Sequence, residues 1–105
     1  MNKEMLKGTT EVMVLKMLNK EPMYGYGLIK KFDVISSGAF KFKEGTLYPI
    51  LHALEKKNFI ESYWDVGDGR RRKYYKITDL GLKQLIVKDK EWFEFSKALN
   101  GILEY

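Results

Sequence analysis

Residues 44–78 decide the fold and read EGTLYPILHALEKKNFIESYWDVGDGRRRKYYKIT. A helix is predicted over residues 44–57, because four apolar residues recur at i, i+3, i+4 and i+7 and so share one face. These residues are Leu47, Ile50, Leu51 and Leu54. Asn58 is expected to end the helix in the left-handed conformation. Two runs of alternating polarity then flank Gly67-Asp68-Gly69, which predicts a β-hairpin. The stretch is therefore a helix followed by a hairpin.

Two further helices are predicted upstream of this stretch. The first spans residues 5–18, where apolar residues lie almost all round the helix, so we expect it to pack on two sides. Glu21-Pro22 ends it, because proline disfavours a helical residue before it. The second is predicted from about Met23 to Ile35, where apolar and aromatic residues at helical spacing form one face. Ser36-Ser37-Gly38 then breaks the pattern.

A long helix is predicted from Thr78, a good N-cap, nearly to the C-terminus. Its apolar residues recur every seven positions and form a stripe too wide to remain in water, so a second copy of the chain is expected to cover it. The apolar first helix would supply the other side of this contact. The residues expected in the dimer interface are Leu85, Trp92, Phe93, Leu99, Ile102, Leu103 and Met13.

Three helices followed by a two-stranded hairpin is the order of a winged helix-turn-helix, whose third helix enters the major groove of DNA. The predicted fold class is therefore α+β and mostly helical, with a winged helix-turn-helix domain over residues 1–78 and a C-terminal dimerisation helix over 79–105. Arg70-Arg71-Arg72-Lys73 beside the hairpin turn supports a DNA-binding wing, because such a cluster can contact the backbone or the minor groove. A solvated charge run is the alternative interpretation.

The composition suits a DNA-binding protein. The net charge is +5 and the pI about 9.3, with the basic excess in residues 1–78, and neutralising phosphates releases condensed counterions. Without Cys, and with no leader or membrane span visible in the sequence, we expect a cytoplasmic protein. A single His, no Gly-rich phosphate loop and no paired carboxylates argue against an enzyme, and we expect no metal or cofactor.

Three motifs make the sequence resemble the PadR-like family of transcriptional regulators over essentially the whole chain. They are PMYGYGLI at Pro22–Ile29, GTLYPILHALE at Gly45–Glu55 and GRRRKYYKIT at Gly69–Thr78. The resemblance implies a homodimeric DNA-binding protein, usually a repressor, that binds an inverted repeat and is released by a small molecule. The chain length is similar to that of the shorter branch, with one C-terminal dimerisation helix. Lys43-Glu44 replace the usual Ser-Pro, which removes a helix cap and places an acidic residue near DNA.

The resemblance also implies contacts with double-stranded DNA: to the major groove from the third helix, to phosphates from the second, and from the wing. The major-groove contacts are Thr46, Tyr48 and His52, and the phosphate contacts from the second helix are Tyr24 and Tyr26. The contacts from the wing are Arg70, Arg71 and Arg72. Charge and position alone add Lys43 and Lys56, and Lys73 completes the basic run of the wing. The alternative is that the three tyrosines are packing residues and that His52 is a plain surface residue.

Trp92 lies where some drug-sensing relatives have a tryptophan that stacks on planar aromatic or cationic compounds at the dimer centre. Asp89, one turn earlier, would then complement the charge of such an effector. Trp92 is alternatively a packing residue of the dimer core. For the whole chain, the alternative function is a winged-helix protein-interaction adaptor without specific DNA binding, because a fold does not dictate a function. The basic run Arg70–Lys73 argues against the adaptor.

Overall fold

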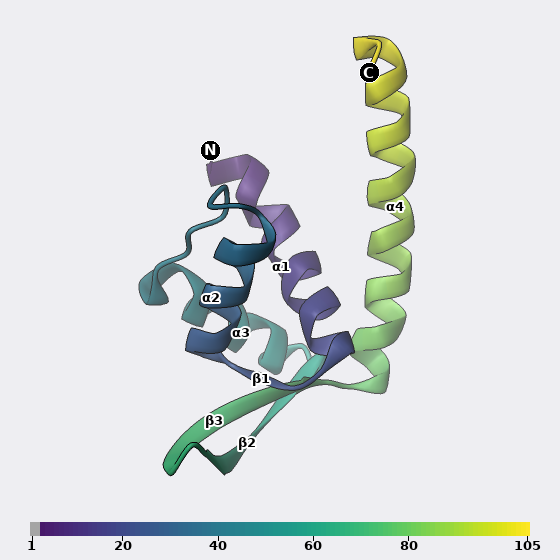
Figure 1. The fold of residues 1–105 in the computed structure, drawn as a ribbon. Coiled ribbons are helices and arrows are strands. Elements are labelled where there is room, and N and C mark those ends of the chain that lie inside the picture. Colours follow the sequence, from purple (N-terminus) through teal and green to yellow (C-terminus); the bar gives the residue numbers. More distant parts are fainter. Residues whose placement is uncertain (1–2) are drawn as a thin grey trace.

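The computed structural model describes residues 3–105, with side chains from residue 8 onward. The elements in chain order are α1 (Lys3–Lys20), β1 (Met23–Tyr24), α2 (Gly25–Ile35), α3 (Glu44–Lys56), β2 (Ile60–Gly67), β3 (Arg70–Ile77) and α4 (Asp79–Leu103). Figure 1 shows α1, α2 and α3 gathered above a small sheet, with α4 standing beside them as a separate column. The predicted order of three helices, a hairpin and a long final helix is thus present.

The hairpin is a regular antiparallel pair closed by a two-residue turn. β2 and β3 pair from Ile60 opposite Ile77 to Gly67 opposite Arg70. The two turn residues, Asp68 and Gly69, both have positive φ, at 54° and 75°. This is typical of a type I′ turn, whose twist matches that of the strands. The basic run therefore lies within strand β3, so consecutive cations point to opposite faces of the hairpin.

The second helix begins later than the sequence predicts, because its first two residues form a strand. Met23 and Tyr24 pair with Tyr75 and Tyr74 of β3, which makes a three-stranded sheet in the order β1-β3-β2. The prediction that Tyr24 belongs to the second helix is therefore wrong. Helical spacing in the local sequence cannot reveal a pairing with residues some fifty positions away, and such tertiary contacts override local propensity.

Both ends of α3 follow from the sequence. Lys43 occupies the N-cap position and gives no side-chain cap, as expected from the missing serine. At the other end Asn58 has φ 63°. The Phe59 N–H donates to the Leu54 carbonyl and the Asn58 N–H to the Glu55 carbonyl, both at 3.0 Å. This is a Schellman motif, which ends the helix and turns the chain directly into β2.

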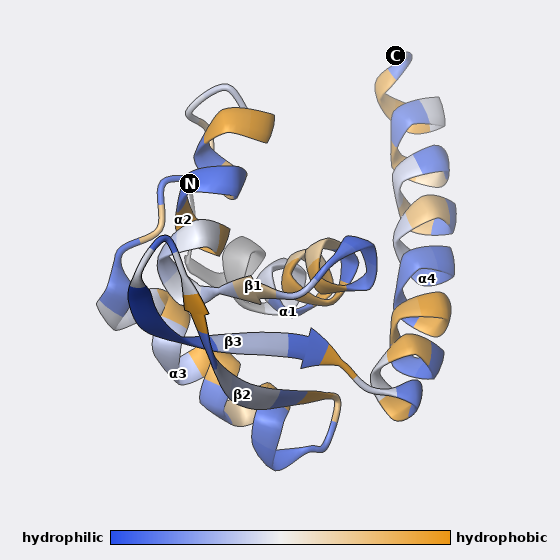
Figure 2. Cartoon of the chain, turned by 60° about the horizontal axis from the view of Figure 1, so that its bottom comes forward, coloured by the Kyte–Doolittle hydropathy of each residue, from blue (hydrophilic) through white to orange (hydrophobic). Residues whose placement is uncertain are grey.

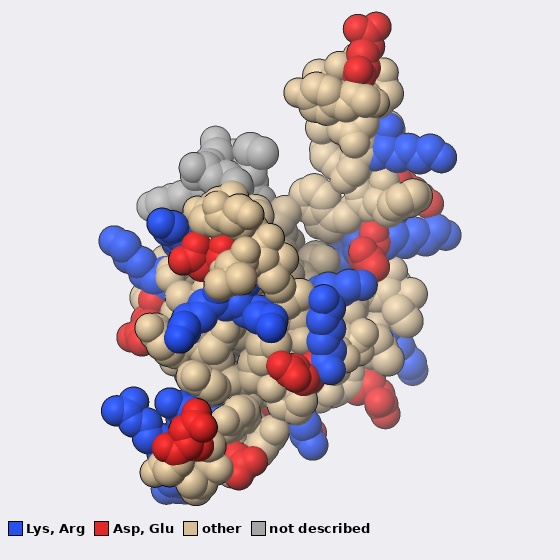
Figure 3. Space-filling view, viewed as in Figure 1, with Lys and Arg blue, Asp and Glu red and all other residues tan. Residues whose placement is uncertain are grey.

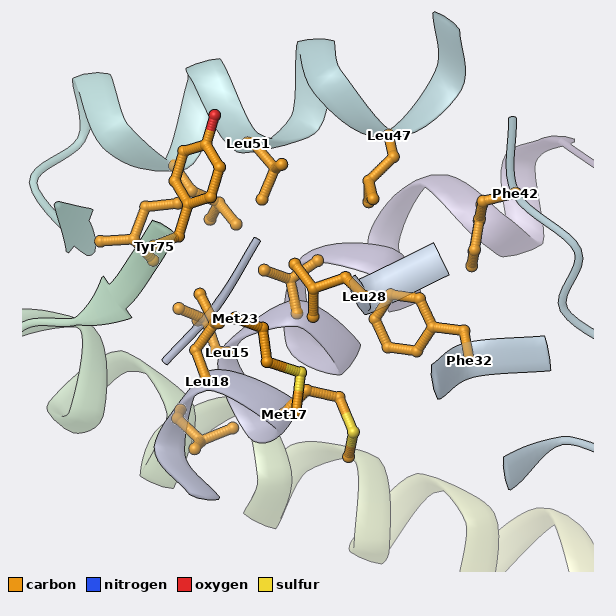
Figure 4. Packing of buried hydrophobic residues seen from close by; sticks show 14 residues of the cluster. Leu15, Met17, Leu18, Met23, Leu28, Phe32, Phe42, Leu47, Leu51 and Tyr75 are labelled. Atoms are coloured by element: carbon orange, nitrogen blue, oxygen red, sulfur yellow. The ribbon is translucent and has the colours of Figure 1, made fainter. Parts of the chain in front are cut away.

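The core lies between the three short helices and the sheet. Its fully buried apolar side chains are Val14, Leu15, Leu28, Leu47, Leu51, Leu54 and Ile60. In Figure 4, Leu47 and Leu51 point from α3 towards Leu28 and Leu15, and the ring of Tyr75 reaches from the sheet to the underside of α3. This packing fixes α3 relative to the wing.

Helix α4 is joined to the wing by Thr78. The hydroxyl of Thr78 accepts the Gly81 N–H at 3.0 Å and donates to the Asn58 carbonyl at 2.6 Å. The first turns of α4 then pack on α1, where the Lys16 ammonium lies 3.7 Å from the Asp89 carboxylate. Leu85 is only 3% exposed and belongs to the core of its own chain. Its assignment to the dimer interface is therefore wrong, because the side chain is already buried within its own chain.

Candidate nucleic-acid interface

A groove of about 680 Å³ lies between the start of α2, the start of α3 and the wing. Of the predicted DNA contacts it brings together Tyr24, Tyr26, Tyr48, Arg70, Arg71, Arg72 and Lys73. Figure 3 shows Lys and Arg side chains gathered at the wing, with acidic side chains among them. The groove thus joins the beginning of the predicted recognition helix to the basic hairpin in one surface.

The remaining predicted contacts lie outside this groove. Thr46, His52 and Lys56 are exposed on α3, and Lys43 is exposed at its N-cap. They present their side chains to solvent and do not line the groove. These residues are thus free to contact DNA from the outer face of α3, but the structure does not bring them together with the wing.

The groove also has lining residues that were not among the predicted contacts, and Lys30, Glu44 and Trp64 are three of them. Lys30 follows Tyr26 by one helical turn, and its ammonium lies 5.5 Å from the centre of that ring, so helical spacing was a usable signal. The sequence indicates Glu44 only as an acidic residue near DNA. Trp64 was not predicted as a contact, because strand alternation places it on the same face as buried Ile60 and so indicates a core residue.

Strand pairing divides the four cations of the wing into two pairs. Lys73 is directly opposite Trp64, and Arg71 is opposite Val66. Residues opposite one another in a sheet share a face, so Arg71 and Lys73 lie on the Trp64 face. Arg70 and Arg72 lie on the other face, with Tyr74. The basic run is therefore two charged surfaces rather than one cluster.

Arg72 is the member of the run that is held within the chain. Its guanidinium lies 4.4 Å from the centre of the Tyr24 ring. It also donates to the Gly67 carbonyl at 3.5 Å and lies 3.6 Å from the Asp68 carboxylate. The side chain is 22% exposed, whereas Arg70 and Arg71 are exposed residues. Arg72 therefore connects the tip of the wing to β1.

Three tyrosine rings continue this contact across the sheet. Tyr24 meets Tyr74 edge to face at 5.6 Å between ring centres, and Tyr74 stacks on Tyr63 at 5.8 Å. Aromatic pairs of this geometry stabilise a sheet beyond their buried area. Tyr24 thus has a packing role, which its half-buried position agrees with.

Tyr48 links α3 to the start of α2. A Cβ at Gly25 would lie 2.6 Å from the Tyr48 hydroxyl, so only glycine allows this close approach. Burial raises the pKa of the Tyr48 hydroxyl, and the negative charge of Glu44 raises it further. Burial likewise raises the pKa of Tyr75, with Glu55 adding to the effect. Both hydroxyls therefore stay protonated at neutral pH, and Tyr48 is a neutral hydrogen-bond donor in the groove.

Comparison with known proteins places this arrangement in a family. The model of the transcriptional regulator PadR-like family matches residues 14–86. The chain belongs to this family. A PadR-like transcriptional regulator from Bacillus cereus is 35% identical and superposes with a TM-score of 0.88 over 98% of this chain and 99% of that one.

Two other relatives match the PadR-like chain over nearly its full length. A transcriptional regulator from Clostridium thermocellum is 31% identical, with a TM-score of 0.85 over 94% of this chain and 97% of that one. An uncharacterized protein from Lysinibacillus sphaericus is 35% identical over 102 residues, which is 96% of this chain and 94% of the relative.

Membership confirms the family resemblance and the mostly helical α+β winged helix-turn-helix fold with its C-terminal helix. PadR-like proteins are transcriptional regulators rather than enzymes, so the prediction that the chain is not an enzyme is also confirmed. Among the helices of residues 3–105, none combines the length and the apolar character that crossing a membrane requires.

Proposed function

We propose that this PadR-like regulator binds an inverted-repeat operator in double-stranded DNA as a homodimer and represses transcription there. The observation that carries the proposal is the groove that joins the start of α3 to the basic wing. The start of α3 enters the major groove, where the N-terminal residues of a recognition helix contact base edges. The wing then lies along the flanking backbone, where Arg70 and Arg71 neutralise phosphates.

The dimer is supported by the surface of α4. From Glu91 to the end of α4 every residue is exposed in the single chain, and apolar residues recur along the helix in Figure 2. The large apolar residues exposed there are Trp92, Phe93, Phe95, Leu99, Ile102 and Leu103. A contiguous apolar surface of this kind marks a protein interface. Phe95 is a member that the heptad spacing alone did not identify.

A second apolar surface on the same chain is available to the partner. A groove of about 400 Å³ lies between α1, the end of α2 and α4. Its apolar lining includes Met13 and Met17 of α1 and Phe32 and Ile35 of α2. The α4 helix of one protomer can cover this groove of the other, which agrees with the predicted contribution of Met13 to the interface. A two-fold axis makes both contacts equivalent.

The two-fold axis determines the operator. Two α3 helices related by this axis enter successive major grooves about 34 Å apart, so the operator is an inverted repeat. A dimer bound across a promoter occupies DNA that RNA polymerase needs, and repression follows from that occupancy.

The proposal includes release by a small aromatic or cationic effector at α4. Trp92 and Phe95 lie edge to face, 5.8 Å between ring centres, and line a hollow with Glu91. Aromatic rings beside a carboxylate suit a planar cation. Asp89, the predicted acidic contact, lines the groove on α1 and lies 3.7 Å from the Lys16 ammonium. Glu91 lies 3.3 Å from the Lys88 ammonium and is the acidic residue that lines the hollow with Trp92. An effector that favours a different separation of the two α3 helices shifts the dimer away from DNA.

The role of Trp92 is tested by titrating a planar cationic acridine dye and recording tryptophan fluorescence. We expect the Trp92→Leu variant to bind the dye at least tenfold more weakly than the wild type, with the dimer verified by sedimentation for both proteins. Equal dye affinities would assign Trp92 to packing of the dimer core.

Operator binding is tested by gel-shift titration against the DNA upstream of the protein's own gene and a shuffled sequence of equal length, at two salt concentrations. We expect operator affinity to exceed that for shuffled DNA by at least about 10³. An Arg70→Ala, Arg71→Ala double variant should bind both DNAs more weakly and with a shallower salt dependence. Equal affinity for both sequences would contradict the proposal and favour a winged-helix adaptor.

A further inference from the structure

The wing carries an apolar surface on the side of the recognition helix. Trp64 and Val66 are 57% and 66% exposed, although they alternate along β2 with the same phase as buried Ile60. In Figure 2 the orange tip of β2 lies beside the most hydrophilic, dark blue stretch of β3. We infer that Trp64, Val66 and the Arg71 guanidinium form a contact surface for the sugar-phosphate backbone that lines the minor groove of double-stranded DNA. The inference rests on the proposed function and extends it.

The direction of this surface follows from contacts further down the hairpin. Ser62, which shares the face of Trp64, donates its hydroxyl to the Glu55 carboxylate of α3 at 2.7 Å. Tyr75, opposite Ser62, is buried on the same face. This face of the sheet therefore covers α3 near the base of the hairpin. Nearer the tip the same face carries Trp64, which lines the groove together with Tyr48.

The charges around the apolar pair identify its partner. The Arg71 guanidinium carbon lies 4.7 Å from the centre of the Trp64 ring. Lys73 is opposite Trp64 and Arg71 is opposite Val66, so two cations border the two apolar side chains. An apolar protein partner would have to desolvate those cations without pairing them, which is costly. A DNA backbone suits both the cations and the apolar side chains, because its phosphates alternate with the C–H surfaces of deoxyribose.

The stack between Trp64 and Arg71 also affects how the cation is presented. A planar guanidinium held against an aromatic ring is ordered before DNA arrives, so less side-chain entropy is lost when it binds a phosphate. This leaves two separable roles for Trp64: direct contact with DNA, as inferred here, or ordering of Arg71 alone. A double-mutant cycle between the two residues separates them.

The test uses the full chain and the operator found in the gel-shift experiment. We expect Trp64→Ala to weaken operator binding about tenfold, as burial of much of an aromatic side chain implies. The slope of log K against log salt should stay unchanged, because an apolar contact releases no counterions, whereas Arg71→Ala should reduce its magnitude by about one. Val34→Ala is the matched control, since Val34 is 77% exposed on α2 and does not line the groove; its affinity should equal that of the wild type.

The tryptophan also supplies a direct signal. Adding operator DNA should change the emission of the wild type and leave that of the Trp64→Phe variant unchanged, with Trp92 present in both. Because phenylalanine keeps an apolar ring, this measurement decides the question even if Trp64→Ala fails to fold.

Several outcomes would overturn the inference. One is wild-type affinity in Trp64→Ala, and another is no loss beyond that of Arg71→Ala in the double variant, which would leave Trp64 only ordering Arg71. A third is altered self-association of Trp64→Ala in sedimentation with operator affinity intact, which would reassign the surface to a contact between copies. Failure of the wild type itself to discriminate the operator would instead contradict the proposed function.

Discussion

At the scale of single residues, three consecutive arginines have three different environments. Arg70 is exposed on one face of the wing, Arg71 stacks on Trp64 on the other, and Arg72 is held against Tyr24. The sequence predicts the hairpin and its charge, because turn residues and alternation are local signals. It could not predict the role of Arg72, whose aromatic partner lies in a strand that forms only through pairing with β3.

Replacing Arg72 should therefore affect the stability of the fold itself. We expect Arg72→Ala to lower the free energy of unfolding by about 1 kcal/mol, because a partly desolvated cation–π contact and a bond to the Gly67 carbonyl are lost. Arg70→Ala removes the same side chain from an exposed position and should leave stability within about 0.5 kcal/mol of the wild type. Urea unfolding measures the free energy of unfolding of both variants. Equal losses in the two would contradict a stabilising role for Arg72.

At the scale of elements, the helices were predictable to the extent that their signals are local. The apolar period of α3, the left-handed Asn58 and the N-cap Thr78 all act within one or two turns, and the structure has each in the predicted role. The start of α2 was misplaced because β1 exists only through its contact with β3. Pro49 also lies inside α3 rather than in its first turn, the position that local chemistry favours.

The start of α4 depends on a glycine that no sequence pattern singled out. A Cβ at Gly81 would collide with the backbone carbonyl oxygen of Phe59. We expect Gly81→Ala to lower the free energy of unfolding by about 2 kcal/mol, because relief requires the backbone to shift. Gly45→Ala in α3 is the control: its Cβ meets no atom within 4 Å, so stability should be unchanged or rise by up to about 1 kcal/mol. Thermal unfolding followed by circular dichroism decides, and a stable Gly81→Ala would contradict the close packing.

At the scale of the whole molecule, α4 is covered at its beginning and exposed at its end. Heptad spacing reveals the stripe but not how far along it the chain covers its own helix, which is why Leu85 was misassigned while Leu99 is exposed. We expect the wild type to sediment as a dimer at micromolar concentration and Leu99→Glu as a monomer, because an unpaired carboxylate would be buried in the interface. Lys97→Glu, which introduces the same charge at an exposed position of α4, should remain a dimer. A dimeric Leu99→Glu would place the interface elsewhere.

Loss of the dimer should be visible in DNA binding as a loss of avidity. When two α3 helices belong to one dimer, binding of the first half-site brings the second to its own half-site at high effective concentration, which strengthens binding by about 10²–10⁴ without new contacts. Leu99→Glu should therefore bind the full inverted repeat no better than a single half-site, whereas the wild type should prefer the full repeat by at least about a hundredfold. Gel-shift titrations on the two DNAs measure this ratio. The wild type and Leu99→Glu should have the same affinity for an isolated half-site, since Leu99 lies in the last turns of α4 and that end of the helix is far from the wing in Figure 1. A wild type that binds half and full sites equally would mean that each chain binds DNA alone.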